Sequence, residues 1–357
     1  MRSAMLLLLA AASLNAEEPA SCQRGLAQVK TSNYADGQAS LWECVESGLG
    51  SETHAYYLGL TYRQLKNYES GLTRTYATLK RLPDNENLLY LAAYLHYRSD
   101  NTKDSMILAS KAYRIAPKDW RIHQLFALNY ISFNMLEAAK LSLLQAISLN
   151  SDNAELYYQL ARLYFTLGSF VDSIKFSQKA LAIFPDYPEA YHNLALSYEG
   201  NGNVDLAIAN FQKAVELNRK FNRQDEWPLI DFAVYQRMGG KPEASLPLLE
   251  EALTINPRSP KANYEMGELL RDMRRYEEAK KYLETAVELD LCNARAIYGL
   301  AILTRYLGDT ARSALLFKRF KEVDQEAKNP ANAGKACQAS PTVADAPPAE
   351  WPASVKD

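Results

Sequence analysis

The sequence is poor in residues that interrupt secondary structure and in residues that hold metal ions. It has 15 Gly and 15 Pro among 357 residues, which argues against turn-rich all-β architectures. Its four Cys form no Cys-x-x-Cys pair and its four His are scattered, so we expect no metal site. An excess of one charge is also absent, because 40 Lys and Arg face 42 Asp and Glu. That balance argues against a nucleic-acid partner.

Long apolar runs are absent beyond the first residues. Met1-Arg2 is followed by an apolar stretch from Ala4 to Leu14, and small residues lead to Ala16, the order found in a secretory signal. The stretch has about half the roughly 20 residues that a membrane span requires, so we expect no stable transmembrane anchor. We expect residues 1–16 to be a signal peptide and the protein to be periplasmic or secreted. Cleavage near Ala10, a lipid-modified Cys22 and a buried N-terminal helix are the alternatives.

The chain repeats itself at intervals of 34 residues. Leu160-Ala161 and Tyr164 recur as Leu194-Ala195 and Tyr198, and such a fixed period is typical of repeat proteins. Blocks that cover residues 18–327 begin at residues 18, 52, 86, 120, 154, 188, 226, 260 and 294, with a four-residue insertion near residues 220–223.

Small side chains occupy two positions of every block. Because small residues let antiparallel helices approach closely, each block predicts a helix, a turn and a second helix. Gly168, Gly202, Gly240 and Gly308 are the predicted turn residues. Position 8 holds Gly25, Gly59, Ala93, Ala127, Ala161, Ala195, Ala233, Gly267 and Ala301, and position 20 holds Gly37, Gly71, Ser105, Ala139, Ser173, Ala207, Ser245, Ala279 and Ser313.

This pattern resembles the tetratricopeptide repeat family. The resemblance implies an all-α fold, an α-solenoid that forms a right-handed superhelix of about nine helix hairpins. It departs from the family pattern at Arg24, where Leu is usual, and at Phe320, where a small residue is expected. Residues 328–357 lack the repeat and are rich in Ala and Pro, so we expect a flexible tail, in which Trp351 is either a docking residue or incidental.

The resemblance also implies that block positions 2, 5, 9 and 12 line a concave groove. A groove lined by Tyr and Arg suits recognition of a peptide or protein partner. The alternative is that the tyrosines fill space between helices and the arginines form a solvated face. Asn193 lies where the family often presents an amide to a peptide backbone. The candidate groove residues are Tyr56, Arg63, Tyr90, Tyr158, Arg162, His192, Asn193, Arg237, Tyr264, Arg271, Tyr298 and Arg305.

Two cysteine pairs are candidates for disulfides. Cys22 and Cys44 fall at positions 5 and 27 of the first block, on its two antiparallel helices, where they approach each other. We expect a disulfide that stabilises this terminal unit by roughly 2–3 kcal/mol, with two buried thiols as the alternative. A bond between Cys292 and Cys337 would require the tail to fold back.

No catalytic signature accompanies the repeats. Gly239-Gly240-Lys241 lacks the flanking residues of a phosphate loop, so we predict neither an enzyme nor a cofactor. The first hypothesis is an envelope adaptor that binds an extended peptide or a partner protein. The alternative is a structural scaffold in an envelope polysaccharide or secretion assembly, whose aromatic residues would also suit a glycan. An accessory subunit of an enzyme is a third hypothesis.

Overall fold

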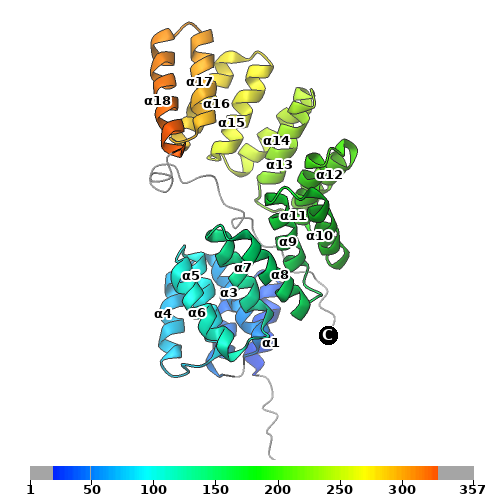
Figure 1. The fold of residues 1–357 in the computed structure, drawn as a ribbon, viewed down its shortest axis with the longest axis vertical. Helices are drawn as coiled ribbons and strands as arrows, with labels where there is room; N and C mark the ends of the chain where they lie inside the picture. Colours follow the sequence, from blue (N-terminus) through cyan, green and yellow to red (C-terminus); the bar gives the residue numbers. More distant parts are fainter. Residues whose placement is uncertain (1–18, 49, 329–357) are drawn as a thin grey trace, which may run out of the picture. The chain divides into compact units, whose positions relative to one another are not determined.

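The protein is entirely helical wherever its structure is described. A computed structural model describes residues 19–48 and 50–328, and it places eighteen helices and no strand in that part of the chain (Figure 1). The all-α prediction is therefore confirmed. The expected signal peptide, Trp351 and Cys337 lie outside the described residues. The helices are α1 (Ala20–Lys30), α2 (Tyr34–Glu46), α3 (Glu52–Leu65), α4 (Tyr68–Leu79), α5 (Glu86–Arg98), α6 (Thr102–Ile115), α7 (Trp120–Ser132), α8 (Leu136–Leu149), α9 (Ala154–Thr166), α10 (Phe170–Ile183), α11 (Pro188–Gly200), α12 (Val204–Lys220), α13 (Trp227–Met238), α14 (Pro242–Ile255), α15 (Pro260–Asp272), α16 (Tyr276–Leu289), α17 (Ala294–Tyr306) and α18 (Thr310–Lys328).

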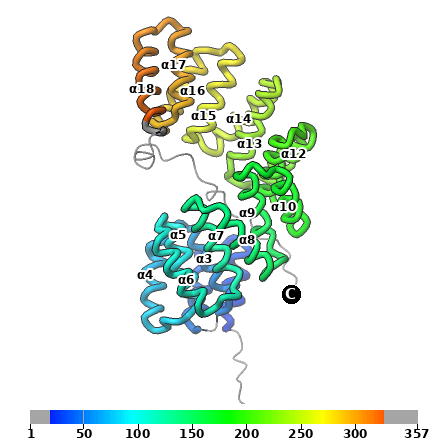
Figure 2. Tube along the Cα trace, viewed as in Figure 1, coloured from blue at the N-terminus to red at the C-terminus, as the bar shows by residue number. Residues whose placement is uncertain are grey.

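Consecutive helices pack as hairpins. The odd-numbered helices begin at a block start or within two residues of one, and pairs such as α5 with α6 and α15 with α16 lie against each other (Figure 2). The chain forms two compact units that divide within α9, between Leu156 and Tyr157. Nothing in the sequence predicted this division, because the 34-residue spacing continues through it. None of the described helices is long and apolar enough to cross a membrane.

The two columns of small residues lie inside the hairpins. All eighteen are buried, from Gly25 in α1 to Ser313 in α18. A Cβ atom at Gly267 would lie 2.6 Å from Cγ of Leu283 in the facing helix, which leaves no room for a larger residue. The close approach that the sequence predicted is therefore confirmed. Three of the serines, Ser173, Ser245 and Ser313, add a hydrogen bond across the hairpin: the hydroxyl of Ser173, for example, donates to the carbonyl oxygen of Ala161 at 2.9 Å.

Every hairpin turns through one residue with left-handed backbone. This residue stands at position 15 of each block, where its φ angle lies between 52° and 92°. Glycine adopts such a φ without strain, and its presence at four of these turns agrees with the prediction. The other five turns use residues with side chains, which the sequence analysis had not identified. The nine residues are Ser32, Lys66, Asp100, Asn134, Gly168, Gly202, Gly240, Arg274 and Gly308.

The four-residue insertion is tied back to the preceding repeat. It extends α12 to 17 residues and ends in a turn at Asn222 with a φ of 49°. Lys220 forms an ion pair of 2.7 Å with Asp186, and Arg223 forms one of 2.7 Å with Glu189. Both acidic partners lie 34 residues earlier in the sequence. The insertion therefore packs against the start of α11, the first helix of the hairpin that it extends.

Candidate functional site

The candidate site is the set of side chains at block positions 2, 5, 9 and 12, which we call the first-helix face. In the first unit much of this face is buried. Tyr90 is only 2% exposed, stacks with Tyr94 at a centroid distance of 6.2 Å and lies 4.5 Å from the guanidinium of Arg121. Burial raises the pKa of Tyr90, as expected for a phenol without water around it. The structure assigns Tyr90 to packing between helices instead of a ligand surface.

The other predicted residues of the first unit are half-buried. Tyr56 lies between the rings of Tyr57 and Trp120, each at a centroid distance of 5.3 Å. Arg63 hydrogen-bonds to Tyr94; burial raises the pKa of that phenol and this hydrogen bond acts against it. Both candidates therefore take part in aromatic packing across neighbouring first helices.

An ionic network that the sequence analysis missed joins three repeats of the first unit. The side chain of Arg121 is fully buried and forms an ion pair with the equally buried Asp119. It also donates to the carbonyl oxygen of Glu52 at 2.5 Å and to Oδ1 of Asn87 at 2.8 Å. Asn87 and Arg121 share block position 2, and Asp119 stands two residues before Arg121. The sequence signal for this network is therefore an Arg that has an amide residue 34 positions earlier and an Asp two positions earlier.

At the start of the second unit the first-helix face is again closed. Tyr158 is 6% exposed and its ring lies 5.1 Å from that of Tyr187. The guanidinium of Arg162 lies 5.5 Å from the Tyr158 ring, a cation–π distance. Tyr158 and Arg162, which were both predicted to bind a ligand, therefore contact each other.

The amide of Asn193 faces the preceding hairpin. Asn193 is 6% exposed, and its Nδ2 donates to the hydroxyl oxygens of Ser173 at 3.0 Å and Ser177 at 2.9 Å. These bonds occupy both protons of the amide nitrogen. The structure therefore places Asn193 in the packing between hairpins and not at a peptide-binding surface. Its neighbour His192 is half-buried, with Nε2 at 2.9 Å from Oδ2 of Asp231.

A buried ion pair beside this region joins α11 to the insertion that follows α12. The side chains of Glu189 and Arg223 are 4% and 6% exposed. Burial raises the pKa of Glu189 to about 7, although Arg223 acts in the opposite direction. Desolvation outweighs the attraction because a carboxylate loses its hydration at this depth.

Two predicted arginines are already neutralised within the second unit. Arg237 pairs with Glu265 and with Asp272, each at 3.0 Å. Arg271 pairs with Glu268 at 2.8 Å. These carboxylates satisfy the guanidinium groups, so Arg237 links α13 to α15 and Arg271 is paired within α15 itself.

The tyrosines of the last two hairpins are more accessible. Tyr264 is half-buried, and burial raises its pKa to about 12, with Glu268 and Glu265 adding to the shift. Tyr298 on α17 is 45% exposed, with its ring 5.1 Å from that of Phe320. Arg305, on the same helix, is exposed. Of the twelve predicted residues, Tyr298 and Arg305 are thus the two that are exposed to solvent.

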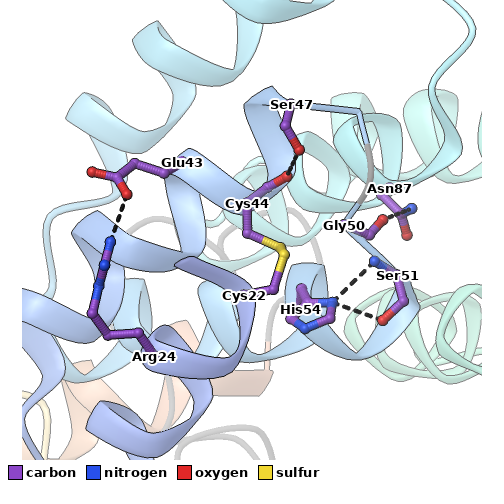
Figure 3. Close-up of a disulfide and its surroundings, with 9 residues drawn as sticks. All are labelled: Cys22, Arg24, Glu43, Cys44, Ser47, Gly50, Ser51, His54 and Asn87. Carbon is purple, nitrogen blue, oxygen red and sulfur yellow. Dashed lines mark hydrogen bonds and ion pairs between the residues drawn. A yellow bond between two sulfur atoms is a disulfide. The ribbon is translucent and has the colours of Figure 1, made fainter. Parts of the chain in front are cut away.

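Cys22 and Cys44 form a disulfide in the first hairpin (Figure 3). Their Cα atoms are 4.9 Å apart and both residues are fully buried. A ring nitrogen of His54 and the two sulfurs lie within 4.8 Å of one another. The ring is fixed by Ser51, whose backbone N–H donates to Nδ1 at 3.0 Å. While the disulfide is intact, neither sulfur is a thiolate that could bind a metal ion.

The same close-up explains one departure from the family pattern. Arg24 replaces the usual apolar residue and forms an ion pair of 2.7 Å with Glu43 across the hairpin (Figure 3). It also donates to Oγ of Ser40 at 3.1 Å. The terminal hairpin thus has a polar outer side, as capping repeats require. The second expected bond, between Cys292 and Cys337, stays a prediction because Cys337 lies outside the described residues.

Comparison with known proteins identifies the repeat. Residues 152–219, 186–258 and 238–303 match sequence models of the tetratricopeptide repeat. BBSome complex member bbs-4 of Caenorhabditis elegans is 25% identical over 185 residues, which cover 52% of this chain and 38% of that protein. Human Protein O-mannosyl-transferase TMTC3 is 26% identical over 281 residues, which cover 74% of this chain and 29% of that protein. The chain therefore spans about a third of the length of these curated relatives.

Solved structures share the fold. A chain in the crystal structure of the APC/C hetero-tetramer Cut9–Hcn1 is similar with a TM-score of 0.60 and 12% identity, covering 88% of this chain and 74% of that one. A tetratricopeptide repeat protein from Parabacteroides merdae has a TM-score of 0.52 and 16% identity, covering 80% of this chain and 97% of that one. At these identities the likeness concerns the fold alone.

Proposed function

Since the chain belongs to the tetratricopeptide repeat family, we propose that it is a non-enzymatic protein–protein interaction module. It binds an extended peptide or a partner protein along the first-helix face and acts as an adaptor. The observation that carries the proposal is that both units are built of helix hairpins, which together account for the described chain from α1 to α18. Stacked hairpins of this kind leave a long row of first helices available to a partner.

The composition of the exposed first-helix face supports this function. Tyr264 and Tyr298 provide rigid rings with a polar hydroxyl, which give contact area at a low cost in conformational entropy. Arg305 provides a planar guanidinium that matches carboxylates. These three residues lie on α15 and α17 of the second unit, so we place the binding surface there.

We further propose that the adaptor works in the cell envelope or outside the cell. The order of residues 1–16 supports this location, as does the Cys22–Cys44 disulfide, since structural disulfides persist in oxidising compartments. Cell fractionation followed by N-terminal sequencing of the purified protein tests the location. A mature chain that begins at Met1 and is found in the cytoplasm would contradict it.

A structural scaffold is the second candidate function. Ile107 on α6 and Leu141 on α8 are 51% and 65% exposed and share block position 22. Apolar side chains repeated at one exposed position favour a partner that packs on the second helices. This partner would be a subunit of a larger assembly, and a glycan on the first-helix face would be compatible with it.

Affinity capture from extracts of the source cells, followed by mass spectrometry, tests the two functions against each other. The first variant carries Tyr264→Ala, Tyr298→Ala and Arg305→Ala, which removes the three side chains of the proposed surface on the first helices. The matched control carries Ile107→Ala, Leu141→Ala and Leu315→Ala, all at exposed positions of second helices. The adaptor proposal predicts that the first variant loses the captured partner and the control keeps it. The reverse result would replace it with the scaffold.

A further inference from the structure

One helix presents the whole first-helix face to solvent. On α17 the positions 2, 5, 9 and 12 are Arg295, Tyr298, Ile302 and Arg305. Their spacings of three and four residues place them on one side of the helix. All four are exposed, with Tyr298 at 45% and Ile302 at 38%. The face therefore has an apolar centre with an arginine at each end.

Neither arginine of this face has an acidic partner among the described residues. No ion pair or side-chain hydrogen bond joins Arg295 or Arg305 to a carboxylate there. On the neighbouring helix α15, the carboxylate of Glu268 lies beside Gly299 and is already engaged, since it pairs with Arg271. The positive charge of the α17 face is therefore not neutralised within the described chain.

On the neighbouring first helix, α15, the positive charges of the first-helix face are neutralised by carboxylates. On α15 the position-2 cation Lys261 pairs with Glu265 at 2.7 Å, and the position-12 cation Arg271 pairs with Glu268 at 2.8 Å. Those carboxylates are 4% and 10% exposed. On α17 the residues at the positions of Glu265 and Glu268 are Gly299 and Ile302, which have no charge. The two helices share a repeat but differ in what they offer to a partner.

We propose that the α17 face binds an acidic segment of a partner protein, with two carboxylates that flank an apolar residue. Ten residues of helix separate the arginines, or about 15 Å along the axis at 1.5 Å per residue. An extended chain at about 3.3 Å per residue covers this span in four or five residues. Each guanidinium grips one carboxylate with two parallel hydrogen bonds, and the apolar residue packs on Tyr298 and Ile302. This inference rests on the proposed function and names its partner class.

Fluorescence anisotropy with the full chain tests the inference. The probe is a fluorescein-labelled peptide with two glutamates four positions apart and a leucine midway, so that all three side chains point to one side of an extended chain, and the reference peptide has glutamine at both glutamate positions. We expect the glutamate peptide to bind about tenfold more tightly or better, with an affinity that falls as salt is added. The variant Arg295→Gln with Arg305→Gln should lose this advantage and bind both peptides alike.

A matched control separates the site from overall charge. Arg258 and Arg274 are exposed arginines of the same unit outside the α17 face, and Arg258→Gln with Arg274→Gln removes the same charge. This control should keep the preference for the glutamate peptide. Equal binding of the two peptides, or an equal loss in the control, would overturn the inference. So would a dimer in sedimentation velocity that only the Arg295→Gln, Arg305→Gln variant disperses, because a second copy would then be the occupant.

The proposed function can survive failure of this test. If the full chain still captures a cellular partner through its first helices while the glutamate peptide does not bind, the adaptor stands and the acidic partner class is wrong. If the glutamate peptide binds but capture depends on the second helices, the α17 site stands and the adaptor is replaced by the scaffold.

Discussion

Two arginines at the same position of the repeat have opposite environments. Arg121 on α7 is fully buried and joins three repeats, whereas Arg295 on α17 is exposed. Two residues earlier, the chain has Asp119 in the first case and Asn293 in the second. Thirty-four residues earlier it has the amide Asn87 in the first case and the cation Lys261 in the second. Neighbours in adjacent repeats therefore decide whether a first-helix residue stabilises the fold or remains available to a partner.

The largest difference between the two arginines should be in stability. Arg121→Met leaves Asp119 buried without its partner, and we expect the free energy of unfolding of the first unit to fall by about 3–5 kcal/mol. The matched change Arg295→Met should alter it by no more than about 0.5 kcal/mol. Urea unfolding followed by circular dichroism measures both. Similar losses in the two variants would contradict the contrast.

The buried ion pair between Glu189 of α11 and Arg223 should make stability depend on pH. Because the folded pKa of Glu189 is raised from 4.5 to about 7, the folded state holds this proton while the unfolded state releases it. The contribution of Glu189 to stability should therefore decrease as pH rises from about 4.5 to 7, by at most about 3 kcal/mol. Thermal unfolding across this range should show the decrease in the wild type and a flatter profile in Glu189→Gln.

The exposed ion pair between Lys220 and Asp186 provides the control for this pH dependence. The side chains of Lys220 and Asp186 are 54% and 42% exposed, and water screens such pairs. Asp186→Asn should change the free energy of unfolding by less than about 1 kcal/mol and leave the decrease between pH 4.5 and 7 in place. A profile that is equally flat in both variants would remove Glu189 as its cause.

The first and last hairpins should differ in local stability. The first is cross-linked by Cys22–Cys44, and replacing both cysteines by serine should lower its stability by roughly 2–3 kcal/mol. Hydrogen exchange measured by mass spectrometry should accelerate in α1 and α2 and remain unchanged in α17 and α18. Intact-mass analysis without reducing agent checks the bond itself. Two free thiols in the purified protein would contradict the pairing.

The smallest expected effect concerns Asn193. Asn193→Ala removes two hydrogen bonds to Ser173 and Ser177, so we expect the second unit to lose about 1–2 kcal/mol. Capture of the cellular partner should remain as in the wild type, since the amide faces the preceding hairpin. A partner lost without any change in the unfolding transition would instead return Asn193 to the binding surface.

Much of the site lay beyond what the sequence can predict. Position 5 holds Tyr90, Tyr158 and Tyr298 alike, yet the first two are buried and the third is 45% exposed. The burial of a residue at this position depends on side chains that are distant in the sequence, such as Arg121 over Tyr90 and Tyr187 against Tyr158. The turns show the same limit, since Lys66 and Arg274 adopt left-handed backbone that is rarely expected of such residues.

The sequence by itself determined the helix hairpins, their 34-residue period and the buried columns of small residues. Antiparallel helices can approach closely only where the side chains are small, so this requirement recurs at fixed positions and is visible in the sequence. Tertiary structure alone decided which first-helix residues remain in solvent and which arginines keep an unneutralised charge. These properties depend on contacts between residues 34 positions apart or more, as between Arg121 and Asn87, and they are set by packing and desolvation, which residue type does not encode.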